Sequence, residues 1–286
     1  MKLRSLLYMP ADNDAFIAKA HQRHADAIIL DLEDSVRPEN KTEARNNLGK
    51  SVMLCKQSGA RVFVRINADH KTALLDALAA LKCDVDGIYV PKAHIKRIRA
   101  LSKSLKPHEQ RLEIAPLPFV ALIEDPKGVL QAKKIARCRR VIGLTIGAED
   151  LANALNASAD PDVMIFPKQF VHFHAKAYGK MSFGLNRSVA DYRDLTAIKA
   201  AAQDAKRFGF DGASCVHPSV VSILNDAFSY SPSELDWARQ IIKASENSTF
   251  SAFVFQGKMV DTPILNRAKM IIADTDGAAG KSIGIN

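Results

Sequence analysis

Eight short runs of apolar residues recur along the chain, and most are followed by a stretch with helical spacing of apolar and charged positions. The runs do not alternate between polar and apolar residues, a pattern typical of strands that are covered on both faces, as in parallel sheets. TALLDALAALK (72–82) and DLTAIKAAAQDAKRFG (194–209) are examples of the helical stretches between them. The predicted strands span residues 5–10, 27–33, 61–67, 87–93, 119–124, 141–150, 181–187 and 212–217.

Eight βα units in succession predict an α/β fold of the (β/α)8 or TIM-barrel type. A doubly wound open sheet is the alternative, and it is less favoured because no GxGxxG or P-loop motif follows the first strand. Another pattern begins near residue 231, with SELDWARQIIKA and then AFVFQGKMVDTPILNRAKMIIA. We expect a barrel domain over 1–230, a C-terminal helical lid segment over 231–273 that packs on the barrel or on a neighbouring subunit, and a flexible tail over 274–286.

Polar side chains gather where the predicted strands end, and the active sites of TIM barrels lie at that face. Carboxylates that meet there repel one another unless a cation lies between them. Two carboxylates leave most of an octahedral shell to water and substrate oxygens, which suits Mg²⁺. The HExxH spacing is missing from the sequence, which disfavours zinc. These strand-end residues are Asp31, Glu33, Asp34, Arg65, Asn67, Lys92, Glu124, Asp125, Glu149, Asp150 and His217.

For each of these acids taken alone, helix capping is the better explanation. Asp125 precedes Pro126 at the start of a predicted helix, and Asp34 has a similar position. The hypothesis of a metal site therefore rests on the convergence of several acids at one barrel face. Lys92 could instead form a Schiff base, as strand-end lysines do in some aldolases, but the paired acids offer a metal route that makes this unnecessary.

The formal charge of +9 and the pI near 9.4 favour an anionic partner. Nucleic-acid binding is disfavoured, because the sequence lacks a zinc finger, a long basic tail and an aromatic-rich RNA-binding motif. No apolar run approaches the roughly 18–20 residues of a membrane span, and the N-terminal residues do not resemble a signal peptide. The four cysteines form no CxxC pair, which favours reduced thiols and a cytoplasmic location. Solvated helix faces explain each basic segment taken alone, and the summed charge still leaves room for a polyanionic ligand such as a CoA derivative.

Several motifs, in this order and spacing, resemble the citrate lyase β-subunit-like family, which belongs to a wider group of aldolases and lyases related to malyl-CoA and citramalyl-CoA lyases. The resemblance implies a TIM barrel that forms trimers or hexamers and acts on acyl-CoA compounds with Mg²⁺, with Mn²⁺ as a substitute. It covers most of the chain through RSLLYMPAD (4–12), DAIILDLEDSV (26–36), VFVRIN (62–67), GIYVPKA (87–93), ALIEDPKGV (121–129), IGAEDLA (146–152), FGFDGASCVHPSVV (208–221) and FQGKMVDTP (255–263).

The resemblance also implies a role for individual residues. Glu124 and Asp150 correspond to the metal ligands, whereas Glu149 is expected to turn away from the metal. Arg65 corresponds to the substrate-binding and catalytic arginine. Asp261 resembles the acid/base residue that a C-terminal lid contributes, often to the site of a neighbouring subunit. The remaining expected site residues are Gly147 and Ala148, whose backbone would line the carboxylate end of the substrate, and Glu33 and Asp34, which would lie near the metal through water.

The segment 183–194 departs from the family pattern, with Arg187 at a position that is commonly uncharged or acidic, so the acyl specificity is open. The expected function is a Mg²⁺-dependent carbon–carbon lyase that cleaves or forms a 3-hydroxy-dicarboxyl acyl-CoA, such as citramalyl-, malyl- or citryl-CoA, with acetyl-CoA and an oxo acid as the cleavage products. Two alternatives are a metal-dependent aldolase on free pyruvate-type oxo acids and a non-catalytic acyl-CoA-binding subunit.

Overall fold

The computed structural model describes residues 2–188, 192–246, 248 and 252–276. The chain divides into two compact units, one of Leu3–Phe228 and one of Ser229–Asn286 with the two N-terminal residues. None of the helices in the described part of the chain is long and apolar enough to cross a membrane.

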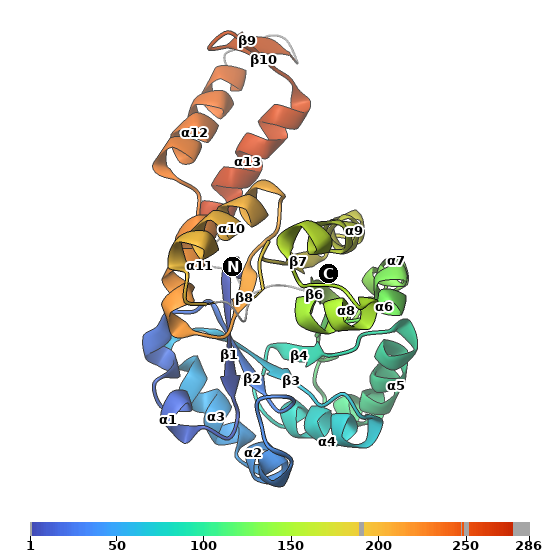
Figure 1. Cartoon of the computed structure of the whole chain (residues 1–286). Coiled ribbons are helices and arrows are strands. Elements are labelled where there is room, and N and C mark those ends of the chain that lie inside the picture. The colour runs from blue at the N-terminus through green and yellow to red at the C-terminus, as the bar shows by residue number, and fades with distance from the viewer. Residues whose placement is uncertain (1, 189–191, 247, 249–251, 277–286) are drawn as a thin grey trace. The chain divides into compact units, whose positions relative to one another are not determined.

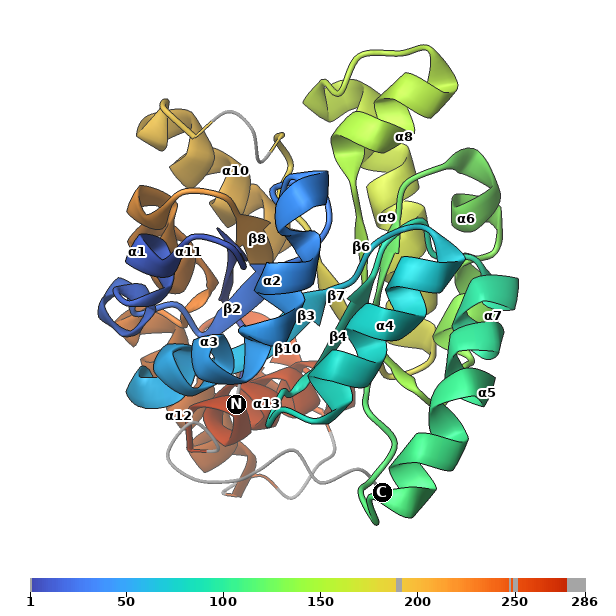
Figure 2. The same ribbon diagram turned by 90° about the horizontal axis from the view of Figure 1, so that it is seen from below.

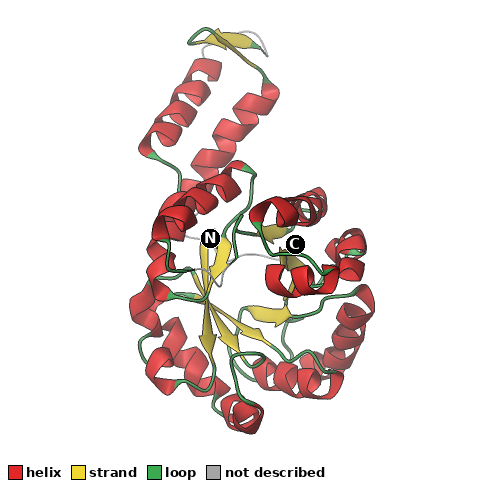
Figure 3. Ribbon diagram, viewed as in Figure 1, coloured by secondary structure: helices red, strands yellow, loops and turns green. Residues whose placement is uncertain are grey.

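The larger unit contains eight parallel strands in the order β7-β6-β5-β4-β3-β2-β1-β8, with helices around them (Figures 1 and 3). A parallel bridge between Phe183 and Gly212 joins the two ends of this order, so the sheet closes on itself. The prediction of a TIM barrel is therefore confirmed. The strands are β1 (Ser5–Pro10), β2 (Ala27–Asp31), β3 (Arg61–Arg65), β4 (Gly87–Val90), β5 (Phe119–Ile123), β6 (Val141–Ile146), β7 (Met181–Phe183) and β8 (Ala213–Cys215).

Neighbouring residues of one strand face two separate cores, which explains the unbroken apolar runs in the sequence. Ile29 of β2 belongs to the core inside the barrel, together with Phe63 and Tyr89. Ile28, one residue earlier, packs in the outer core between strands and helices. Because both faces are covered, neither face needs polar residues.

The ring of helices around the strands is seen from below in Figure 2. Some predicted helices are broken: residues 41–59 form α2, α3 and a 3-10 turn, and residues 128–138 fall into α6 and α7, which meet at Gln131. The helices of this unit are α1 (Asp14–Ile17), α2 (Lys41–Asn46), α3 (Leu48–Cys55), α4 (His70–Leu81), α5 (Ile95–Arg111), α6 (Pro126–Leu130), α7 (Ala132–Ala136), α8 (Ala148–Leu155), α9 (Pro161–Ala177), α10 (Leu195–Arg207) and α11 (Val221–Phe228).

The predicted strand over 141–150 is wrong in its second half. Strand β6 ends at Ile146, Gly147 is the N-cap residue, and Glu149 and Asp150 lie in the first turn of α8. Acidic residues are favoured there because they complement the positive end of the helix dipole. The predicted strands 181–187 and 212–217 are also too long, since β7 and β8 contain three residues each. Between β6 and β7 the chain also forms the 17-residue helix α9, which was not predicted from the sequence.

The smaller unit consists of α12 (Pro232–Glu246), the strands β9 (Phe253–Phe255) and β10 (Lys258–Val260), and α13 (Thr262–Asp276). The two strands pair antiparallel. Gln256 and Gly257 between them both have positive φ, as a tight two-residue hairpin turn requires. This unit has its own apolar core, which includes Ile241, Val260 and Ile271. Residues 274–276 form the end of α13, and the rest of the expected tail, 277–286, lies outside the described residues.

Candidate active site

A pocket of about 280 Å³ lies among residues at the carboxyl ends of the barrel strands. This is the face at which TIM-barrel active sites form. Its wall carries acidic, basic and apolar side chains. The lining residues are Tyr8, Asp31, Ser35, Arg65, Leu122, Glu124, Thr145, Ile146, Gly147, Ala148, Glu149, Asp150, Lys168, Phe183, Gly184, Leu185, Arg187, Ser188, Ser214 and Val216.

Glu124 follows β5 directly, and its side chain is only 5% exposed. Its Oε2 accepts a hydrogen bond of 2.6 Å from the backbone N–H of Lys92. Burial raises the pKa of Glu124 to about 7, the Lys92 N–H opposes this, and the charge of Asp150 raises it further. A cation next to the two carboxylates would relieve both the burial and the repulsion.

Gly147 makes room for the Glu124 side chain. A Cβ atom at Gly147 would lie 2.7 Å from Cγ of Glu124, closer than real side chains pack. The Gly147 N–H donates to the carbonyl of Ile123 at 3.0 Å. Since Gly147 precedes the first turn of α8, the glycine brings Asp150 and Glu124 together. The first-turn N–H groups of a helix, such as that of Ala148, have no acceptor within the helix.

Asp150 is exposed and lines the same pocket as Glu124. The neighbouring Glu149 accepts a hydrogen bond from the hydroxyl of Ser188, so its carboxylate is engaged by the segment after β7. Among the described residues, no group of three or more Asp, Glu, His or Cys side chains is arranged to hold a metal. Two carboxylates of this kind fit Mg²⁺, which retains several water or substrate oxygens, and do not fit a structural zinc site.

Arg65 at the end of β3 is held by a bidentate ion pair. Its Nε and Nη2 donate to Oδ1 and Oδ2 of Asp31, each at 2.7 Å. Nη1 lies 3.3 Å from a carboxylate oxygen of Glu33 and 3.3 Å from one of Asp34. The guanidinium also lies 5.0 Å from the ring centre of Tyr8. Burial acts to raise the pKa of Asp31, but its contacts with Arg65 outweigh this, and the pKa is lowered.

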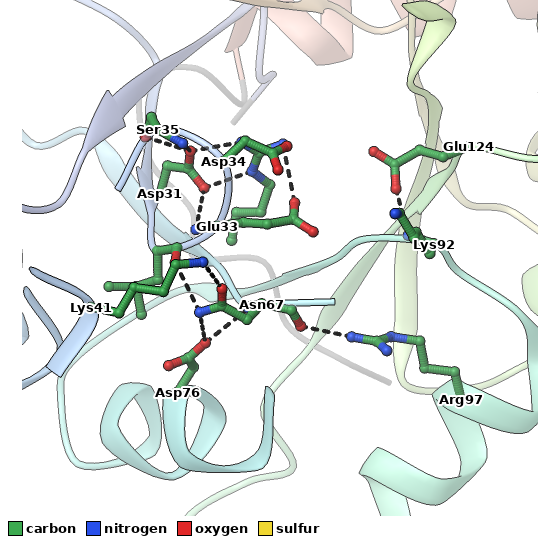
Figure 4. A network of polar contacts seen from close by, with 12 residues as sticks. Asp31, Glu33, Asp34, Ser35, Lys41, Asn67, Asp76, Lys92, Arg97 and Glu124 are labelled. Carbon is green, nitrogen blue, oxygen red and sulfur yellow. Dashed lines mark hydrogen bonds and ion pairs between the residues drawn. The ribbon is translucent and has the colours of Figure 1, made fainter. Parts of the chain in front are cut away.

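Glu33 is buried beside Arg65, and its carboxylate extends toward Glu124 (Figure 4). Burial raises the pKa of Glu33 to about 8, Arg65 opposes this, and the charges of Asp34 and Glu124 add to the rise. Its Oε2 lacks a hydrogen bond of good geometry although Arg65 is near. Glu33 and Asp34 therefore lie next to Arg65, close to the acidic side of the pocket, but they do not line the pocket themselves.

A hydrogen-bond network fixes the loop that follows Arg65 (Figure 4). The side chain of Asp76 in α4 is fully buried and accepts from the backbone N–H of Asn67 at 2.8 Å and from its amide at 2.7 Å. The Asn67 amide also donates to the Leu32 carbonyl at 2.8 Å. Arg97 donates to the backbone carbonyl of Asn67 at 2.8 Å. These contacts hold the segment next to Arg65 rigidly in place.

The other strand-end residues have local roles. Asp125 caps α6 by accepting from the Gly128 N–H at 2.8 Å, as the capping interpretation predicted, and it contacts His94 at 2.6 Å. His217 contacts the Ser219 hydroxyl at 2.7 Å in the loop after β8. The side chain of Lys92 is exposed, and the backbone of this residue adopts φ +46°.

Asp261 lies in the smaller unit, between β10 and α13. Its carbonyl accepts from the N–H of Leu265 at 3.0 Å, and its carboxylate lies 3.4 Å from the N–H of Ile264. These contacts are those of an N-cap residue. The acid/base role of Asp261 stays a prediction.

Two residues of the pocket have roles that were not predicted from the sequence. Asp31 was recognised as a strand-end acid, but its partnership with Arg65 follows from the register of β2 and β3, in which the two are paired. Lys168 was missed because α9 was not predicted. Met164, Lys168, Val171 and Ala175 recur at helical spacing and are all buried, and this spacing was the available signal.

The fold and the pocket define a TIM-barrel protein with paired carboxylates at the active-site face. The chain belongs to the HpcH/HpaI aldolase/citrate lyase family, whose model matches residues 4–218. It is 32% identical over 276 residues to a citrate lyase subunit beta-like protein of Mycobacterium tuberculosis, covering 93% of each chain. It is 30% identical over 288 residues to a (3S)-malyl-CoA thioesterase of Cereibacter sphaeroides, covering 96% of this chain and 95% of the relative.

A similar solved structure is that of the protein CitE from Mycobacterium tuberculosis in complex with magnesium, acetoacetate and coenzyme A. The two structures agree with a TM-score of 0.77 and 30% sequence identity, over 95% of this chain and 97% of that chain. The family resemblance inferred from the motifs is thus confirmed.

Proposed function

We propose that this protein is a Mg²⁺-dependent carbon–carbon lyase whose substrate is a 3-hydroxyacyl-CoA with a carboxylate on the carbon that bears the hydroxyl. The pairing of buried Glu124 with Asp150 at the pocket carries the proposal. The CitE complex with magnesium and coenzyme A supports both ligands. Citryl-, malyl- and citramalyl-CoA have the required groups.

Glu124 and Asp150 would hold the metal in this reaction. Bound Mg²⁺ would orient the substrate hydroxyl and carboxylate and make the hydroxyl more acidic. In cleavage the hydroxyl loses its proton, the bond to the CH₂ carbon breaks, and the electron pair passes to the thioester side as an enolate. The products are an oxo acid and, after protonation of the CH₂ carbon, acetyl-CoA.

Arg65 would stabilise the negative charge on the oxygen of the hydroxyl as that charge develops. Its guanidinium is fixed by Asp31, so little reorganisation is needed when the charge appears. The first turn of α8, with the N–H of Ala148, would receive the substrate carboxylate, since helix N-termini favour anions. The N–H of Gly147 would not bind the substrate carboxylate itself, because it already donates to the Ile123 carbonyl.

A panel of malyl-, citramalyl- and citryl-CoA, with and without Mg²⁺, tests the proposal. We expect at least one of these to yield acetyl-CoA and an oxo acid only when Mg²⁺ is present. Release of free CoA together with an intact hydroxy acid would identify a thioesterase instead. Turnover of free oxo acids without a CoA group would identify an aldolase. Binding of all three compounds without turnover would favour a non-catalytic acyl-CoA-binding subunit.

Asp261 would supply the proton to the enolate carbon, from a neighbouring subunit of a trimer or hexamer. We expect Asp261→Asn to lower turnover by about 10²–10⁴-fold, the usual contribution of general acid–base catalysis, and to retain substrate binding. Asparagine also caps helices well, so α13 should remain intact. Stopped-flow turnover and calorimetric binding measure the two effects.

Mixed oligomers test whether Asp261 acts across subunits. Co-refolded Asp261→Asn and Glu124→Gln subunits would regain part of the activity, because a site with intact Glu124 would receive Asp261 from its neighbour. Each variant alone serves as the control. Mass spectrometry shows whether the mixtures contain oligomers of both variants. If such mixed oligomers regain no activity, Asp261 acts in the site of its own subunit or only caps α13.

A further inference from the structure

Lys168 is a buried cation in the wall of the active-site pocket. It belongs to α9, and its side chain is 7% exposed. The ammonium donates one hydrogen bond, of 2.6 Å, to the backbone carbonyl of Leu185. Within the described ranges Lys168 forms no ion pair, and the Leu185 carbonyl is its one hydrogen-bond partner. Two of its three N–H donors are therefore unused by the described side chains.

A buried charge without a partner is unfavourable. Burial lowers the pKa of Lys168 to about 8, and the charge of Glu149 opposes this. The group is therefore still mainly protonated at neutral pH. In the described part of the chain Glu149 forms no ion pair with Lys168, and its carboxylate accepts a hydrogen bond from the Ser188 hydroxyl. The pocket wall thus contains an ammonium group that an anion can neutralise.

The location of Lys168 indicates which part of a substrate it meets. Glu124 follows β5 and Asp150 follows β6, whereas Leu185, the partner of Lys168, follows β7. The cation thus lies one strand further round the barrel than the proposed metal ligands. A pocket of about 280 Å³ accommodates an acyl group but not a whole CoA. A second carboxylate on the acyl group fits this position better than a CoA phosphate.

We propose that Lys168 is a specificity-determining residue that binds a carboxylate arm on the hydroxyl-bearing carbon of the substrate. This inference rests on the proposed function and narrows its substrate class. Citryl-CoA has a CH₂–COO⁻ arm at that carbon, and citramalyl-CoA has a methyl group at the same place. The corresponding oxo acids, oxaloacetate and pyruvate, differ by the same carboxylate. Lys168 therefore selects citryl-type substrates.

The test compares wild-type protein with Lys168→Gln and Lys168→Arg. Glutamine retains a donor for the Leu185 carbonyl but removes the charge, and arginine retains the charge. Lys176→Met is the matched control, because Lys176 belongs to the same helix but pairs with Asp211 outside the pocket. Circular dichroism and thermal unfolding establish that each variant is folded.

Calorimetric binding of oxaloacetate and pyruvate with Mg²⁺, and KM for citryl- and citramalyl-CoA, are then measured. We expect Lys168→Gln to weaken oxaloacetate binding roughly 10- to 100-fold, the range for a hydrogen bond to a charged group, and to leave pyruvate binding unchanged. Lys168→Arg should retain the preference for oxaloacetate, as should Lys176→Met. If Lys168→Gln weakens the binding of both oxo acids equally, or of neither, the assignment is overturned and Lys168 only supports the Leu185 backbone.

The binding data separate this inference from the proposed function. Wild-type protein that binds oxaloacetate through Lys168 but cleaves no CoA ester would contradict the lyase proposal alone. Wild-type protein that cleaves the esters with no dependence of the citryl-to-citramalyl ratio on Lys168 would contradict this inference alone. Loss of the preference in a pantetheine thioester as well as in the CoA ester would exclude a CoA phosphate as the anion.

Discussion

Glu124→Gln and Asp150→Asn should each lower kcat/KM for the cleaved CoA ester by about 1,000-fold or more. The reason is the loss of a metal ligand, since metal coordination contributes several kcal/mol of charge stabilisation and about 4 kcal/mol corresponds to this factor. Calorimetric titration with Mg²⁺ should show a parallel loss of metal affinity. The Lys92 N–H can still bond to the amide oxygen of the glutamine, so the local backbone should persist.

The metal-free stability of Glu124→Gln separates lost ligation from misfolding. Glu124 has a pKa raised by burial and by the charge of Asp150, so removal of its charge relieves an unfavourable state. We expect the melting temperature without Mg²⁺ to be unchanged or higher. Asp125→Asn is the matched control, because it changes the adjacent acid but retains a good cap for α6. Full Mg²⁺-dependent turnover in both ligand variants would rule out the metal assignment.

The barrel could be predicted from the sequence because its pattern is repeated. Each strand is buried on both faces, so a run such as AIILD stands out without help from any other part of the chain. The ends of the elements were harder to predict. VIGLTIGAED reads as one strand, but the glycine at 147 allows Glu124 to pack against it and starts a helix. The contact joins residues that are 23 positions apart, so a local sequence pattern does not predict it.

The acids near the site could be predicted because each carboxylate follows a predicted strand in the sequence. Their partners could not be predicted, since these depend on strand register and on burial. Asp31 looks like any other strand-end acid until β2 pairs with β3 and places it opposite Arg65. Lys168 looks like a surface lysine until α9 packs on the barrel and the lysine falls on its buried face. Residues whose role comes from tertiary partners need the fold before they can be assigned.

Asp31→Ala should destabilise the protein by about 3–5 kcal/mol, the usual cost of leaving one partner of a buried ion pair alone. Arg65 would lose both of its 2.7 Å hydrogen bonds to Asp31 and would retain only the longer contacts with Glu33 and Asp34. Urea unfolding measures this change. Turnover should fall as well, because the guanidinium would no longer be held in one orientation.

The double variant Asp31→Leu with Arg65→Met distinguishes stability from function. Replacing both partners of a buried ion pair with apolar residues is often neutral or stabilising. The double variant should recover part of the lost stability, but not all of it, because Glu33 loses Arg65 and the N–H groups of Glu33 and Ser35 lose Asp31. Its activity should not recover, because the proposed oxyanion donor is gone. Wild-type stability in Asp31→Ala would mean that Glu33 and Asp34 alone neutralise Arg65. Recovered activity in the double variant would show that the Asp31–Arg65 pair supports the barrel and has no part in the chemistry.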